Sequence, residues 1–277
     1  MNPITKDRNR TKTSKLFCAP DADVSFLSSD NVLFKLHSMH FRTNSEIFLA
    51  PEDAFVVTEA AQLSERAEIL ELLFQFVEPP PESRNYRYPS VMTLKVEIFF
   101  ALAEAAEKYI VYGAMSTCIT QMPNMIFFNS FKVLNHTVKH GYWEIAENAA
   151  RRCLEVESPL EEATSTLTSP GVLQKWVVYY NAWRDAGKKA SVIFAKNMNG
   201  ACHIWAHGYT KYLRRIDKMP SLFTLICLPD AEFETLNPCK IRNCTCGALG
   251  RNPQFLPWLT EIYALPAIVP KLIDIVI

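Results

Sequence analysis

Glycine is scarce in this sequence: the chain has 277 residues and only 8 of them are glycine. None is arranged as G-x-G-x-x-G or G-x-x-x-x-G-K, the loops whose backbone N–H groups hold a phosphate, and no G-x-S-x-G nucleophile motif occurs. A Ser, His and Asp triad assembled from distant positions would leave no such motif, but nothing in the sequence calls for one. We therefore expect no catalytic residues and no enzymatic activity.

The chain also lacks an excess of charge of either sign, since 29 lysines and arginines balance 29 aspartates and glutamates. Neither nucleic acid nor an anionic membrane surface is favoured as the main partner. Basic residues gather only near the N-terminal end, where no apolar period is present. We expect a disordered basic tail over residues 1–16, with a localisation signal as the alternative interpretation.

Long uncharged apolar runs are absent as well. A membrane-spanning helix needs about 20 such residues, and the most apolar segment, FLPWLTEIYALPAIVPKLIDIVI, contains three prolines and three charged residues. We expect this segment to pack against the rest of the chain. No apolar stretch of the secretory type lies near the start, so we expect the 8 cysteines to be free or metal-bound in an intracellular, cytoplasmic or nuclear protein.

A chain of this length can form two domains, and the hydrophobic patterns change near residue 121. Residues 24–26 and 32–36 alternate around polar turn formers, which predicts a β-hairpin. A short helix follows, then a third strand near residues 54–63 and a helix from Ser64 to Val77, with Ser64 as its cap. A further helix is predicted over residues 97–118.

Beyond Pro123 the periodicity predicts helices alone. One pair of helices is expected to turn at Gly141, and another helix to begin at Ser169 and Pro170. A separate amphipathic segment is expected from about residue 188 to 215. Trp176, Tyr180 and Trp183 have helical spacing, which favours core or interface anchors over a stacked ligand.

Two separated stretches resemble the BTB/POZ domain. DADVSFLSSDNVLFKLHSMHFRTNSEIF is similar to its start, with Asp23, Phe34, His37, Ser45 and Phe48 at the family's offsets. LAEAAEKYIVYGAMSTC is similar to its paired helices. The matching residues there are Ala106, Glu107, Lys108, Tyr109, Val111 and Cys118.

The resemblance covers residues 17–121. LLFQFVEPPPE and VKHGYWEIAENAA further resemble a large group of fungal BTB proteins in which helices follow the domain. The resemblance implies an α+β fold for the BTB/POZ domain, which is a short sheet with helical hairpins. An all-α, BACK-like region is expected to follow over residues 122–277.

This resemblance implies a non-enzymatic protein–protein interaction module. The family often forms homodimers, and some members are adaptors that bind a cullin scaffold and present targets for ubiquitin transfer. Ser38 stands where many members have a basic residue near the dimer interface, and the proline run of residues 79–81 follows the helix that would meet a cullin. The interaction residues expected on this basis are Asp23, His37, Ile69, Leu73, Phe76 and Tyr109.

Two sets of residues have the composition of a metal site. His37 and His40 are three apart at a helix start and can share a face as metal ligands or as an acid/base pair. With no cysteine or second acid at ligand spacing nearby, we expect His37 to be structural.

The second set lies in the C-terminal half. His203 and His207, with Cys244 and Cys246, offer zinc ligands although no Cys-x-x-Cys is present. A zinc-stabilised helical binding protein is thus the alternative function. No other cofactor is expected.

Overall fold

The computed structural model describes residues 11–47, 60–79, 87–197, 210–211, 213–216 and 256–276. It divides into two compact units, residues 1–124 and 125–277. The fold is mixed α/β, with a small four-stranded sheet and mostly helices. The sheet belongs to the first unit, and the described part of the second unit is helical.

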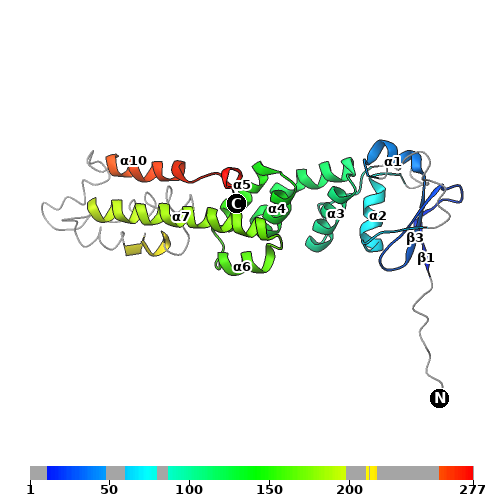
Figure 1. Ribbon diagram of the computed structural model, residues 1–277, viewed down its shortest axis with the longest axis horizontal. Coiled ribbons are helices and arrows are strands. Elements are labelled where there is room, and N and C mark those ends of the chain that lie inside the picture. Colours follow the sequence, from blue (N-terminus) through cyan, green and yellow to red (C-terminus); the bar gives the residue numbers. More distant parts are fainter. Residues whose placement is uncertain are drawn as a thin grey trace, which may run out of the picture. The chain divides into compact units, whose positions relative to one another are not determined.

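The sheet contains β1 (Lys12–Cys18), β2 (Val24–Leu27), β3 (Val32–Leu36) and β4 (Ala61–Gln62), in the order β1-β3-β2-β4. Figure 1 labels the neighbouring strands β1 and β3. The predicted hairpin is confirmed, because β2 and β3 pair antiparallel with Phe26 opposite Phe34. Asn31 turns the chain with a positive φ of 61°, a conformation that asparagine tolerates well. Both phenylalanines face the core.

Strand β1 corrects the expected tail over residues 1–16, because Lys12–Cys18 pairs parallel with β3. Only Ser14 and Phe17 of this strand are buried, so no alternating apolar pattern marks it. Phe17 anchors the strand, because its ring packs tilted against that of Phe34 and edge-on against that of Phe74, at centroid distances of 6.3 and 5.9 Å. Residues 1–10 lie outside the described part.

Three helices complete the core of the first unit: α1 (Ser38–Asn44), α2 (Ala67–Gln75) and α3 (Val96–Lys108). Helix α2 contacts both β1 and α3 (Figure 1). Its Phe74 is fully buried, with its ring centroid 5.3 to 5.9 Å from four other phenylalanine rings. Those rings belong to Phe17, Phe26, Phe34 and Phe41. One side chain of α2 therefore joins the sheet and α1 in a single aromatic core.

Two predicted helix boundaries are corrected. Helix α2 begins at Ala67 and not at Ser64, because the Ala67 N–H is bonded by Asp30 of the hairpin turn, 2.8 Å away. The helix expected over residues 97–118 breaks at Ile110, which has a φ of 49°, and α4 (Tyr112–Lys139) follows. Tertiary contacts cause this break, since Val111 bridges to Ser45.

The boundary between the two units falls within α4, which has a kink at Asn129. The second unit continues with α5 (Trp143–Cys153), α6 (Pro159–Thr166), α7 (Pro170–Asn197) and α10 (Leu256–Ala264). Two short 3-10 helices, η2 (Leu265–Ile268) and η3 (Leu272–Asp274), follow α10. Helix α7 contacts α10 and η2, and α5 contacts η3.

Several predictions for this unit are confirmed. Gly141 turns the chain between α4 and α5 with a φ of 81°, and α7 begins at Pro170. Trp176, Tyr180 and Trp183 are buried. The separate segment expected from residue 188 is corrected, since α7 is continuous to Asn197.

The apolar C-terminal segment packs as expected. Its buried residues in the described part are Ile262, Leu265, Leu272 and Ile275. Among the helices of the described residues, none combines the length and the hydrophobicity that crossing a bilayer requires.

Candidate functional site

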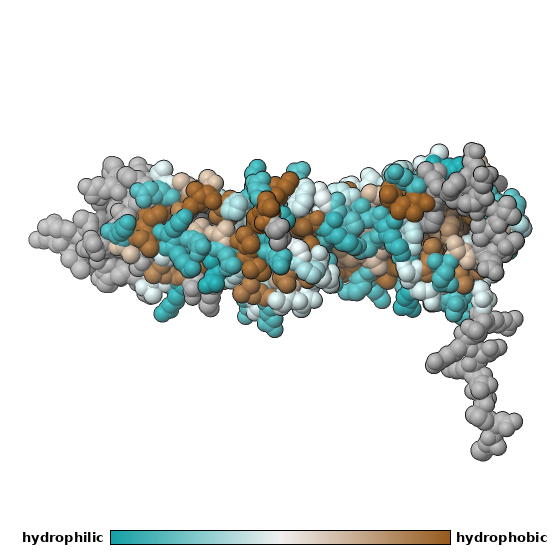
Figure 2. Space-filling model, in the orientation of Figure 1, coloured by the Kyte–Doolittle hydropathy of each residue, from teal (hydrophilic) through white to brown (hydrophobic). Residues whose placement is uncertain are grey.

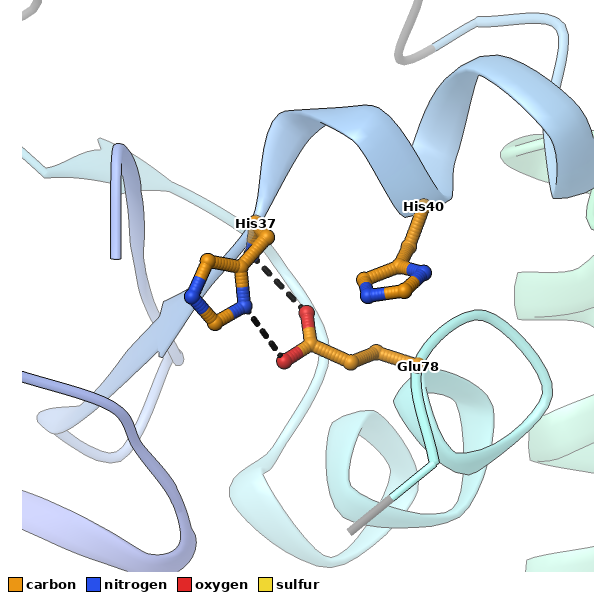
Figure 3. A group of neighbouring side chains, drawn as sticks. All are labelled: His37, His40 and Glu78. Atoms are coloured by element: carbon orange, nitrogen blue, oxygen red, sulfur yellow. Dashed lines mark hydrogen bonds and ion pairs between the residues drawn. The ribbon is translucent and has the colours of Figure 1, made fainter. Parts of the chain in front are cut away.

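Three potential metal-ligating side chains, which we name the His–His–Glu cluster, meet at the junction of β3 and α1 (Figure 3). His37 is the residue between the strand and the helix, and His40 is the third residue of α1. Glu78 comes from just beyond α2, 41 residues after His37. One donor atom from each residue lies within 4.8 Å of the donor atoms of the other two.

Glu78 is held in place by the end of α2. Its N–H donates to the carbonyl of Phe74 at 2.8 Å, and Phe76 and Val77 beside it are buried. Only 7% of the Glu78 side chain is exposed. A carboxylate buried to this degree requires polar partners.

His37 supplies both partners of that carboxylate. Its backbone N–H donates to Glu78 Oε2 at 2.8 Å, and its ring Nδ1 lies 2.8 Å from Glu78 Oε1. Its other ring nitrogen, Nε2, is 3.4 Å from Asp21 Oδ1. The hydrogen bond to Glu78 raises the pKa of His37 above its ordinary value, against the opposing effect of burial, and Asp21 adds to the rise. The imidazole is therefore fixed between two carboxylates.

Asp23 defines the start of α1 beside the cluster. Its carboxylate accepts the Ser38 N–H at 2.7 Å and the Ser38 hydroxyl at 2.6 Å. Burial opposes ionisation of Asp23, but the hydrogen bonds from Ser38 outweigh it and the pKa is lowered. Asp23 and His37, both expected at an interaction surface, thus lie at the same junction, with Asp23 exposed and His37 partly exposed.

The other expected interaction residues lie in the core. Ile69, Leu73, Phe76 and Tyr109 are each exposed by 6% or less, because they face inward from α2 and from the residues that end α2 and α3. Their side chains are therefore buried in the single chain. Tyr109 instead donates its hydroxyl to the carboxylate of Glu65.

The zinc ligands expected in the C-terminal half, His203, His207, Cys244 and Cys246, lie outside the described residues, as does Phe48 of the first pattern.

A hollow of about 340 Å³ in the second unit also contains polar side chains. Its polar groups pair with one another: Glu147 Oε1 accepts both the Tyr179 hydroxyl at 2.9 Å and the Arg151 Nε–H at 3.1 Å. The contact with Tyr179 joins α5 to α7, and the contact with Arg151 lies within α5. The hollow is therefore better explained as a structural junction than as a ligand site.

Sequence reasoning missed Glu78, although a signal was present. Leu70, Phe74 and Glu78 follow one another at intervals of four, so a glutamate stands in line with the buried face of the helix. An acidic residue at such a position predicts a buried partner. The pattern did not reveal that the partner is His37, because the two residues are distant in the chain.

No protein-family model matches the chain, and a search of curated proteins found no similar protein.

Proposed function

We propose that residues 17–121 form a BTB/POZ-type module and that the chain acts as a non-enzymatic protein-binding scaffold or adaptor. The observation that carries the proposal is that the two quoted stretches stand at the start and the end of one run of elements. The hairpin β2–β3 is followed by α1, β4, α2 and the pair α3 and α4, an order consistent with the fold that the resemblance implies. The first partner proposed is a second copy of the chain.

The exposed side chain of Met39, next to Ser38, supports self-association. The resemblance implies a dimer interface at this junction, where Met39 of α1 is 67% exposed. Burying a methionine contributes about 1.5–3 kcal/mol, and exposed apolar patches often mark interfaces. Figure 2 displays hydrophobic patches interrupting the hydrophilic surface of the face it draws.

Light scattering coupled to size exclusion on the full chain tests the proposal. We expect the mass of a dimer for the wild type and the mass of a monomer for Met39→Glu. Met92→Glu is the matched control, because Met92 is similarly exposed, at 74%, but lies outside α1. A wild-type monomer at the highest soluble concentration would contradict self-association.

Capture of a cullin scaffold from a cell extract tests the adaptor role. We propose that the protein acts in the cytoplasm or nucleus, where cysteines stay reduced. Cys118 and Cys153 fit this setting as buried free thiols, and burial raises the pKa of both, that of Cys118 to about 12. A dimer that captures no cullin would support the scaffold role over the adaptor role.

A further inference from the structure

We propose that the His–His–Glu cluster binds a divalent transition metal ion, with zinc as the first choice. The ligands are one ring nitrogen each from His37 and His40 and one carboxylate oxygen of Glu78. A fourth position is left for water. This site goes beyond the proposed protein-binding role and does not depend on it.

The geometry needs only a small adjustment. Zinc binds histidine nitrogen and carboxylate oxygen at about 2.0–2.2 Å, so tetrahedral ligands stand roughly 3.3 Å apart. His37 Nδ1 and Glu78 Oε1 are 2.8 Å apart, and all the donors lie within 4.8 Å of one another. Small rotations of the side chains therefore bring them to ligand positions. Figure 3 displays both imidazoles on the side of α1 that faces Glu78.

The surroundings of His37 suit a metal ligand. When the ion replaces the Nδ1 proton, which leaves to solvent, Nε2–H remains as a donor to Asp21, 3.4 Å away. Histidines that bind metals usually donate their second N–H to a carboxylate or carbonyl, and this contact fixes the ring. Glu78 can bind through Oε1 alone and keep the His37 N–H on Oε2.

The presence of His40 favours a metal site over a purely structural hydrogen bond. A hydrogen-bonded contact that holds the end of β3 to the end of α2 requires only His37 and Glu78. His40 nevertheless stands one turn away, with its ring centroid 6.0 Å from that of His37 and the rings at 80°. Two imidazole nitrogens and one carboxylate oxygen favour zinc and its neighbours over calcium or magnesium, which prefer oxygen ligands.

The test is a calorimetric titration of the full chain with Zn²⁺ after removal of metal by a chelator. His40→Gln removes one ligand and leaves the His37–Glu78 contact intact, whereas Arg42→Gln is the control at an exposed position of the same helix. We expect His40→Gln to lose one bound equivalent that Arg42→Gln keeps. Asp21→Asn should weaken that equivalent by about 10–100-fold.

The comparison between variants isolates this site from other histidines and cysteines of the chain. Equal stoichiometry and affinity in the wild type and His40→Gln would overturn the proposal. If His40→Gln fails to fold, nuclear magnetic resonance of the wild type decides: Zn²⁺ must shift the imidazole resonances of His37 and His40. Unchanged resonances at saturating Zn²⁺ would overturn it.

Discussion

At the scale of single residues, aspartates of the hairpin hold the starts of two helices. Asp23 bonds the first residue of α1, and Asp30 bonds the first residue of α2. Both contacts place a negative charge at the positive end of a helix. The sequence showed Asp23 through a family pattern, but Asp30 looked like an ordinary turn residue, since its partner Ala67 is 37 residues away.

Replacing Asp30 tests the second of these contacts. Asp30→Ala should lower the free energy of unfolding by about 1 kcal/mol, the usual cost of losing a helix cap, as measured by urea unfolding. Ser29→Ala, an exposed neighbour in the same turn, is the control and should stay within about 0.5 kcal/mol of the wild type. Equal losses of unfolding free energy in both variants would show that the turn contributes to stability and that the contact with Ala67 does not.

Glu65 predicts a dependence of stability on pH. Burial opposes its ionisation, but hydrogen bonds from Lys108, Tyr109 and Ser64 outweigh it, so the pKa is lowered from 4.5. A lowered folded-state pKa stabilises the protein above the unfolded value, and that gain is lost as the pH falls through the folded value. The stability difference between the wild type and Glu65→Gln should therefore be constant near neutrality and shrink below about pH 4.5.

Chemical unfolding at a series of pH values measures this difference. The exposed Glu46→Gln variant should follow the wild type throughout. A difference for Glu65→Gln that does not vary with pH would indicate lost packing instead of lost charge.

At the scale of elements, short sequence patterns predicted those elements that interactions between neighbouring residues determine. The hairpin, the turn at Gly141 and the start of α7 follow from alternation, glycine and a Ser-Pro pair. The break at Ile110 was missed because a β-branched residue seldom adopts positive φ. It is imposed by contacts from elsewhere: Ser45 donates its hydroxyl to the Tyr109 carbonyl at 2.6 Å, and Val111 pairs with the same serine.

Two glycines of the second unit should respond in opposite directions to the same substitution. Gly141→Ala should lower the unfolding free energy by about 1–2 kcal/mol, because alanine resists the left-handed conformation. Its added Cβ would meet nothing closer than Trp143 Nε1 at 3.9 Å, so the cost is one of backbone conformation. Gly171→Ala should raise the unfolding free energy by up to about 1 kcal/mol, because the position is helical. Nothing lies within 4 Å of the Cβ added there. Thermal unfolding of both variants checks the signs, and a loss in both would contradict this explanation.

At the scale of the whole molecule, the change from mixed α/β to helical structure was visible in the sequence, because strand alternation ends while helical periodicity continues. The domain boundary expected near residue 121 follows the end of the sequence stretch that resembles the BTB/POZ domain. The two units of the structure divide after Asn124, inside α4. Contacts over long separations were not visible: Glu147 of α5 accepts the Leu272 N–H at 2.8 Å, 125 residues away.

Glu147 should therefore hold the C-terminal segment onto the second unit. Glu147→Ala removes acceptors for Leu272 and Tyr179, and each hydrogen bond to a charged group contributes about 1.5–3 kcal/mol. We expect faster hydrogen exchange at the Leu272 amide and lower stability. Glu144→Ala, on the exposed side of the same helix, should leave that exchange rate unchanged. Unaltered exchange in Glu147→Ala would exclude this role.

Strand β1 has a practical consequence for anyone who shortens the chain. It forms one edge of the sheet and covers the outer hydrogen-bonding side of β3. Starting the protein at residue 19 would remove what looks like the end of a basic tail, together with the anchor Phe17. The uncovered β3 would then present open backbone groups to other chains, a common origin of aggregation. A truncation at residue 19 would therefore be expected to promote aggregation through the uncovered edge of β3.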